Sequence, residues 1–452
     1  MKNYGEINHA LAAKKKLWII VLLAIGMIAC ADRNTPESPS TDTSDTETPG
    51  DTTITTADTI AIAWNGTTAT VTGSHDSVSV TTSNGYVTVN STVKDITYLL
   101  SGNGQGQLTI YGTNRHQLIL NNLTLTCSDG PAINNQCKKS CFVLLQGTSS
   151  LTDGSSYVSS SEDRKGTFFS EGQVIMSGSG SLNIQGNYKN GLCSDDYIRF
   201  AESTGIITIT AVNKGIEAND GIYFEGGTFV INAGSEGIES DSVLVISGGE
   251  IYVKAADDAI NSGDDMTISG GIVMAYSTGN DGLDANGNCY IKGGIVYAIG
   301  AREPEVAIDA NSEEQKQLYV QGGTIVAIGG LENGASLSQT CYSASSVSQN
   351  TWYALYSGSD LAFVFKTPSS LSSSTFVVST GGTASLQSGV TTSGGSSILN
   401  SFALSAPTVS GGSSVTLSSY TGGNAGGGPG GGGNPGGNPG GGGPGGGGPG
   451  GH

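Results

Sequence analysis

The sequence is poor in basic residues. It has 19 lysines and arginines against 38 aspartates and glutamates, which gives a formal net charge of −19. Binding to nucleic-acid phosphates needs a basic face, so this balance argues against a nucleic-acid partner. An acidic protein that meets an anionic partner needs a cation between the two.

Long apolar runs are also scarce. Residues 17–29 are apolar but too short to span a bilayer comfortably, and they follow the lysines at 14–16. This layout is typical of a secretory signal peptide over residues 1–29. The leader ends in Met-Ile-Ala-Cys at 27–30 and resembles a bacterial lipobox. That resemblance implies a lipidated Cys30 and a lipid-anchored protein at the outer membrane or cell surface; the alternative is an ordinary leader with a cysteine nearby.

Both ends of the chain lack the apolar residues that a core needs. Residues 30–59 are polar, acidic and proline-bearing, which predicts a disordered tether. Residues 422–452 are almost entirely glycine, proline and asparagine, which predicts a disordered tail. The fold is therefore expected within residues 60–421.

The cysteines form no spacing typical of a metal knuckle. An exported chain permits disulfides, and a bridge among Cys127, Cys137 and Cys141 remains open. Cys289 falls at a core position of the repeat described next, so we expect it to be a buried free thiol.

A repeat of about 22 residues fills the middle of the chain. A small residue followed by an aliphatic one recurs with spacings of 22, 22, 23 and 25 residues, at Gly215, Gly237, Ala259, Gly282 and Ala307. Each copy has three short segments of alternating polarity, with a glycine pair before the third. The residues expected to point inward are Ile216, Ile238, Ile260, Leu283 and Ile308 in the first segment, Phe224, Ile246, Ile268, Ile291 and Val320 in the second, and Phe229, Ile251, Val273, Val296 and Ile325 in the third.

This pattern predicts an all-β fold, a parallel β-helix with three strands per coil, over residues 60–330. A β-sandwich or a propeller is the competing architecture, but a four-stranded propeller blade needs a longer period than 22 residues, so the β-helix is favoured. Residues 331–421 still alternate like strands but lose the glycine pair. They are expected to form either a cap on the last coil or a small appended β module.

Acidic residues concentrate on the first strand of each coil and its corners. Two carboxylates about 5 Å apart on neighbouring coils repel by roughly 1 kcal/mol in water and by about 3–4 kcal/mol at an effective dielectric constant of 20. Ca²⁺, which takes six to eight oxygen ligands, would relieve that repulsion. The candidate calcium ligands are Glu217, Asp220, Glu236, Glu239, Asp241, Asp257, Asp258, Asp264, Asp281, Asp284 and Asp309.

A solvated acidic face without any metal is the alternative. It predicts acids on all outward columns, whereas the second and third segments carry mostly Tyr, Val, Thr and Met at their outward positions. The concentration on one strand therefore favours calcium.

Several successive motifs resemble a known family. The stretches NYKNGLCSDDYIRF, NKGIEANDGIYFEGGTFVINA, DDAINSGDDMTISGG and NDGLDANG are similar to the carbohydrate-binding domain family with a pectate-lyase-like right-handed β-helix, over residues 97–330. The resemblance implies an extracellular protein that binds calcium and plant cell-wall polysaccharide, notably polygalacturonate or cellulose. A pectate polyanion and an acidic protein would then be joined by bridging Ca²⁺.

Two other functions remain open. A pectate lyase of this shape uses a basic residue to abstract a proton, and Lys214 or Lys254 is the candidate base; without a pair of basic residues beside one acidic cluster, binding is favoured over catalysis. A structural adhesin, in which calcium only stabilises the rod, is the second alternative. Tryptophan is rare, with three in the chain, so the expected sugar-stacking residues are Tyr223, Tyr290 and Tyr319.

Overall fold

The computed structural model describes residues 52–55, 58–344 and 346–422. Within these ranges the regular elements are β-strands, apart from the three-residue 3-10 helix η1(Ser312–Glu314). No helix of the described chain is long and apolar enough to cross a membrane. The predicted all-β class is confirmed. The predicted signal peptide, Cys30 and nearly all of the predicted tail lie outside the described residues.

The first strand of each coil contributes to one sheet of ten strands. Its first two strands form an antiparallel hairpin, and from the second strand onward each pairs in parallel with the equivalent strand of the next coil. The strands are β3(Val78–Ser83), β4(Tyr86–Ser91), β6(Leu108–Gly112), β8(Ile133–Asn135), β11(Gly166–Ser170), β14(Asn190–Ser194), β17(Ile216–Ala218), β20(Ile238–Ser240), β23(Ile260–Ser262) and β26(Leu283–Ala285). We call this sheet the first face.

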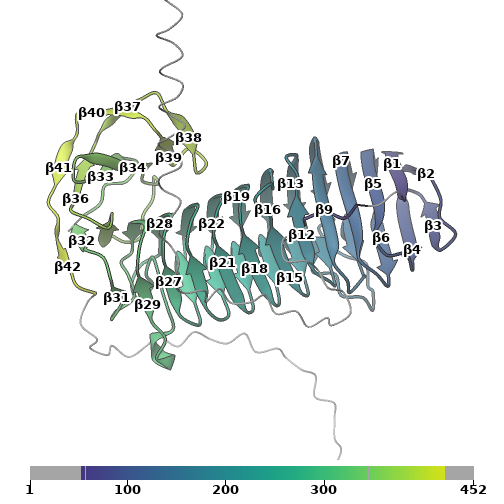
Figure 1. The fold of residues 1–452 in the computed structure, drawn as a ribbon, viewed down its shortest axis with the longest axis horizontal. Coiled ribbons are helices and arrows are strands. Elements are labelled where there is room, and N and C mark those ends of the chain that lie inside the picture. Colours follow the sequence, from purple (N-terminus) through teal and green to yellow (C-terminus); the bar gives the residue numbers. More distant parts are fainter. Residues whose placement is uncertain (1–51, 56–57, 345, 423–452) are drawn as a thin grey trace, which may run out of the picture. The chain divides into compact units, whose positions relative to one another are not determined.

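The second face is the parallel ladder β9(Cys141–Gln146), β12(Val174–Ser177), β15(Tyr197–Phe200), β18(Gly221–Phe224), β21(Val243–Ile246), β24(Met266–Ile268), β27(Cys289–Ile291), β29(Leu318–Val320) and β31(Ser336–Leu337). The third face is the ladder β10(Thr148–Thr152), β13(Ser181–Gly186), β16(Ile206–Ala211), β19(Thr228–Ala233), β22(Glu250–Ala255), β25(Ile272–Ser277), β28(Ile295–Ile299) and β30(Thr324–Ile328). Figure 1 shows these strands stacked in sequence order.

Three long strands join the second and third faces at the N-terminal end. They are β1(Thr59–Gly66), β5(Ile96–Gln105) and β7(His116–Thr126), which pair in parallel with each other. The register of the β5–β7 pair shifts between Ser101 and Gly102, where the strands pass from one face to the other. The coils are therefore continuous from β1 onward.

The predicted inward residues form the core. The structure pairs Ile216 with Ile238 and Ile260 with Leu283 on neighbouring coils, and an isolated parallel bridge adds Ile308. All fifteen predicted inward residues have 0% exposure. One coil cannot bury its own apolar side chains, but each coil covers those of its neighbours, which confirms the predicted parallel β-helix.

The glycine pair makes the corner before each third-face strand. In one copy, a Cβ on Gly248 would lie 2.2 Å from the carbonyl oxygen of Glu225 in the previous coil. The next residue, Gly249, has a φ of 93°, a left-handed conformation that favours glycine. The repeat therefore needs glycine at both positions.

The coil stack continues beyond the predicted end at Gly330. Leu331 forms a parallel bridge with Ile308, and β31 adds to the second face. The last coil is then covered by antiparallel pairing of β35(Phe376–Ser379) with β30 and with β32(Cys341–Ala344), which also pairs with β42(Ser418–Tyr420). At the N-terminal end, β2(Thr68–Thr72) folds back antiparallel on β1.

A small β module is formed by strands that lie between the cap strands in the sequence. Its main antiparallel sheet contains β33(Trp352–Ser357), β34(Asp360–Lys366), β36(Ala384–Ser388), β38(Ser396–Ile398), β39(Ala403–Ser405) and β41(Ser413–Val415), and a second pair is β37(Thr391–Ser393) with β40(Thr408–Ser410). The outward Tyr252, Met274 and Tyr297 of the third face share one buried cluster with Phe363 and Phe365 of this module. Residues 331–422 thus provide both a cap and a module, and the module explains why the third face is apolar outside.

Ile54, which falls within the predicted tether, contacts the solenoid, a contact that the sequence did not predict. Ile54 packs with Phe142 and Ile175 outside the second face, and its backbone N–H donates to the Gln117 side chain over 3.2 Å. Burying this isoleucine offsets the ordering of a short segment. The described cysteines are all free thiols, so no bridge joins Cys127, Cys137 and Cys141, and Cys289 is buried as predicted.

Candidate cation and carbohydrate site

The acidic column of the first face follows the expected register. Glu217 on β17 lies beside Glu239 on β20, followed by Asn261 on β23 and Asp284 on β26. The isolated bridge at Ile308 places Asp309 next in the column. The neutral Asn261 divides the column into two parts with different surroundings.

The N-terminal part is neutralised by a lysine. The Lys214 ammonium lies 3.0 Å from Glu217 Oε1 and also forms an ion pair with Glu239. Glu217 Oε2 accepts further hydrogen bonds from Asn190 Nδ2 at 2.5 Å and from the Cys193 thiol at 3.0 Å. We call Lys214, Glu217 and Glu239 the lysine-paired cluster.

Protonation in the lysine-paired cluster follows from these contacts. Burial by itself raises the pKa of Glu217, but the Cys193 hydrogen bond and the Lys214 charge leave it lowered. Burial raises the pKa of Glu239 despite the same lysine. Burial alone would lower the pKa of Lys214, but the hydrogen bonds and negative charges of Glu239 and Glu217 outweigh burial, so the pKa of Lys214 is raised. Lys214 therefore stays protonated and is a poor general base.

The C-terminal part of the column brings carboxyl groups together without a lysine. Asp281, Asp284 and Asp309 each offer an oxygen within 4.8 Å of the others. Asp258 joins them, because its Oδ1 accepts from the Asp281 backbone N–H over 2.9 Å. Asn261 donates to Asp284 Oδ2 over 3.0 Å. We call Asp258, Asp281, Asp284 and Asp309 the open acidic cluster, since in the described ranges no lysine, arginine or histidine forms an ion pair with them.

The open acidic cluster is largely buried, with Asp258 5% and Asp281 7% exposed. Burial, followed by the Asp284 charge, raises the pKa of Asp258 to about 8. Burial also raises the pKa of Asp281 to about 8 and that of Asp284 to about 6. The pKa of Asp309 is raised by burial and by a hydrogen bond with Glu332. These carboxyl groups bind protons readily because no positive group compensates them.

Glu332 was missed by the sequence analysis. The sequence does contain a signal for it, because Leu331-Glu332 repeats the pattern of Ile308-Asp309 one coil later, but the predicted β-helix ended at Gly330. Ser312 Oγ donates to Glu332 Oε1 over 2.9 Å. A second missed contact is the Val306 backbone N–H, which donates to Asp281 Oδ1 over 2.5 Å.

The other predicted ligands lie elsewhere in the fold. Asp257 is the neighbour of Asp258, and its charge acts on Asp284 and on Glu305. Glu236 accepts from Ser235 Oγ over 2.5 Å. Asp220 and Asp264 occupy the corners that follow β17 and β23, and Asp241 follows β20, where burial raises its pKa.

The predicted tyrosine column is divided. Tyr290 and Tyr319 stack with ring centroids 4.9 Å apart and planes 7° apart, and Lys292 Nζ lies 5.0 Å from the Tyr290 ring. Tyr223 lies on the same face three register steps earlier, beyond Val245 and Thr267, and contacts Tyr197 edge-on. Lys254 lies on the third face, 5.6 Å from the Tyr276 ring, on a different sheet from the acidic column.

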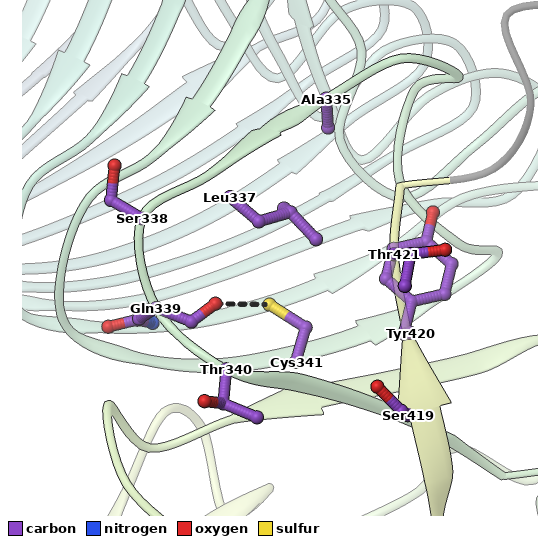
Figure 2. A pocket seen from close by; sticks show the side chains of 9 residues that line it. All are labelled: Ala335, Leu337, Ser338, Gln339, Thr340, Cys341, Ser419, Tyr420 and Thr421. Carbon is purple, nitrogen blue, oxygen red and sulfur yellow. Dashed lines mark hydrogen bonds between the residues drawn. The ribbon is translucent and has the colours of Figure 1, made fainter.

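A pocket of about 490 Å³ lies at the C-terminal end of the coil stack. Figure 2 shows its lining, including Leu337, Cys341 and Tyr420, with the Cys341 thiol 3.7 Å from the Gln339 carbonyl oxygen. No residue of the open acidic cluster lines it. The pocket is therefore separate from the acidic column.

A parallel β-solenoid with a buried acidic cluster on one face is the class of protein defined by this geometry. The family model of the carbohydrate-binding domain-containing proteins matches residues 83–243 and 235–394. These matches span more than half of the chain, so the protein belongs to that family, as the motifs indicated.

No curated protein matches the sequence. One solved structure, described as the polysaccharide lyase-like protein from C. thermocellum in a gadolinium derivative, is similar with 24% sequence identity and a TM-score of 0.46; the match covers 52% of this chain and 96% of that chain.

Proposed function

We propose that this protein is an extracytoplasmic carbohydrate-binding protein that captures an acidic polysaccharide, such as polygalacturonate, through bound Ca²⁺. The open acidic cluster carries this proposal, with family membership as its context. Three carboxyl groups within 4.8 Å, without a basic partner among the described residues, form a site that a divalent cation would stabilise.

The donor set fits calcium. Ca²⁺ takes six to eight oxygen ligands, and carboxylate oxygens are prominent among them. Two of the oxygens already accept hydrogen bonds, Asp281 Oδ1 from Val306 and Asp284 Oδ2 from Asn261. The three aspartates alone therefore do not complete the coordination sphere, which leaves positions for water or for a uronate carboxylate.

The charge of the chain supports the same ligand chemistry. A protein of net charge −19 repels a polyanion unless cations lie between them. A calcium ion held by Asp281, Asp284 and Asp309 would supply that bridge. The paired rings of Tyr290 and Tyr319, on the adjacent face, offer an apolar surface for a sugar ring.

The lyase alternative is weaker than the binding function. Lys214 stays protonated between Glu217 and Glu239, and Lys254 lies on another face. A protonated lysine neutralises its neighbours but does not abstract a proton. We therefore propose binding without cleavage. We also retain the proposal that a lipid on Cys30 anchors the protein to the outer membrane or cell surface.

Retention on immobilised polygalacturonate tests this function. We expect the wild-type protein to be retained in calcium and released by EDTA. Asp284→Asn should abolish retention, whereas the control Asp264→Asn, an acidic corner residue outside the cluster, should not. Retention that survives both EDTA and Asp284→Asn would contradict the proposal. A protein that binds calcium but no polysaccharide would instead support the structural adhesin.

A further inference from the structure

A pocket of about 450 Å³ lies at the N-terminal end of the first face. Its lining residues are Asn90, Ser91, Thr92, Tyr111, Gly112, Thr113 and Gln136. None of them is charged, in contrast to the acidic column farther along the same sheet. The register of β4 and β6 places Asn90 directly beside Tyr111.

One loop holds two sides of this pocket in place. The loop spans residues 153–165, between β10 and β11. The Tyr111 hydroxyl donates to Glu162 of the loop, and this hydrogen bond, with burial, raises the pKa of Tyr111 to about 12. Gln136 Nε2 donates to the Asp163 carbonyl oxygen over 3.1 Å. The tyrosine and the amide are therefore oriented before any ligand arrives, which lowers the cost of binding.

The pocket presents an aromatic ring beside uncharged polar groups. Tyr111 is 39% exposed although its hydroxyl is bound, so its ring is available as an apolar surface. The side chain of Asn90 makes no hydrogen bond to a described residue and offers both a donor and an acceptor. Ser91, Thr92 and Thr113 line the same hollow.

We propose that this pocket is a subsite for one uncharged pyranose residue of a polysaccharide, bound without calcium. The apolar face of the sugar ring stacks on Tyr111, and the sugar hydroxyls hydrogen-bond to Asn90 and Gln136. The volume is within the usual range for a small-ligand site. An anionic sugar is disfavoured, because no lining residue carries a positive charge.

This subsite is distant from the open acidic cluster. Seven register steps separate β6 from β26 along the first face, which is about 34 Å at ~4.8 Å per coil. The proposal rests on the carbohydrate-binding part of the proposed function and is independent of its calcium part. The two sites can therefore be tested separately.

Titration calorimetry in EDTA with cellohexaose and with mannohexaose tests the subsite. We expect saturable binding of at least one of these uncharged oligosaccharides. Tyr111→Ala should weaken it by about tenfold, which corresponds to about 1.4 kcal/mol. The matched control is Tyr86→Ala, because Tyr86 is also an exposed tyrosine (36%) whose hydroxyl donates to a carboxylate, that of Asp129, but it does not line the pocket. The control should bind as the wild type does.

Further variants separate the two sites. Asp284→Asn should leave binding of the uncharged oligosaccharides unchanged, and Tyr111→Ala should leave calcium-dependent retention on polygalacturonate unchanged, which also shows that the variant folds. Glu162→Ala should weaken oligosaccharide binding by loosening the Tyr111 ring, and Glu162→Gln, which keeps an acceptor, should restore it. The subsite proposal would be overturned if neither oligosaccharide bound, or if Tyr111→Ala bound as tightly as the wild type. Neither result would affect the calcium proposal.

Discussion

Replacing Asp284 by asparagine should have opposite effects on stability with and without calcium. Asp284 lies within 4.8 Å of Asp281 and Asp309 and accepts a hydrogen bond from Asn261. Without a cation its charge is a liability, because no positive group of the described chain pairs with it. If calcium binds as proposed, the same carboxylate would become a ligand.

The size of each effect follows from the site. Burial raises the pKa of Asp284 from 3.8 to about 6, so ionising it in the folded protein costs about 3 kcal/mol at pH 8. A partly buried asparagine avoids that cost, but its imperfect hydrogen bonding destabilises the folded protein by about 1 kcal/mol. Asp284→Asn should therefore stabilise the metal-free protein by about 1–2 kcal/mol. Calcium at a hundredfold excess over its dissociation constant contributes about 2.7 kcal/mol, and loss of this ligand removes most of it.

Thermal unfolding followed by circular dichroism at pH 8 measures both effects. At about 2–4 °C per kcal/mol, the variant should melt several degrees above the wild type in EDTA and below it in calcium. Glu217→Gln is the control, because Glu217 pairs with Lys214 and its loss should lower the melting temperature equally in both conditions. A decrease of the same size in EDTA and in calcium for Asp284→Asn would refute the assignment of the open acidic cluster as a cation site.

Three further predictions concern pH, catalysis and anchoring. In EDTA the wild-type protein should lose stability as the pH rises from 5 to 9. The pKa values of Asp258 and Asp281 are raised to about 8 in the folded protein, so the stability that their protonated forms contribute is fully present below the unfolded pKa of about 4 and is lost as the pH rises through 8. Calcium should flatten this pH dependence in thermal scans. Incubation with polygalacturonate should release no unsaturated, ultraviolet-absorbing product; a product that disappears in Lys214→Ala would make the protein a lyase. Cys30→Ser should move the protein out of the membrane fraction, and a variant that stays there after a high-salt wash would contradict lipidation.

The repeat could be predicted from the sequence because it is enforced by local chemistry. An inward aliphatic residue on each strand and a glycine pair at each corner recur with a nearly constant period, so positions such as Ile238 and Gly249 are readable from the spacing alone. The ends of the stack were harder to predict. Leu331 continues the coil without a following glycine pair, and Ile54 docks on the solenoid from a segment with few other apolar residues.

The acidic column was predictable as a column, but its division into two parts was not. Register places Glu217, Glu239 and Asp284 in line, yet whether a carboxylate is paired depends on side-chain reach. Lys214 lies just before Ile216 and contacts both Glu217 of its own coil and Glu239 of the next, a choice that spacing does not encode.

A single neutral residue separates the two outcomes. Asn261 occupies the position between Glu239 and Asp284 and donates to Asp284 rather than adding a charge. On one side of it a lysine belonging to the chain supplies the positive charge. On the other side the carboxyl groups retain protons, with Asp258 and Asp281 at pKa values of about 8. Lys214 neutralises the lysine-paired cluster, whereas no described basic residue pairs with the open acidic cluster. An exchangeable cation is therefore the simplest partner for the open acidic cluster.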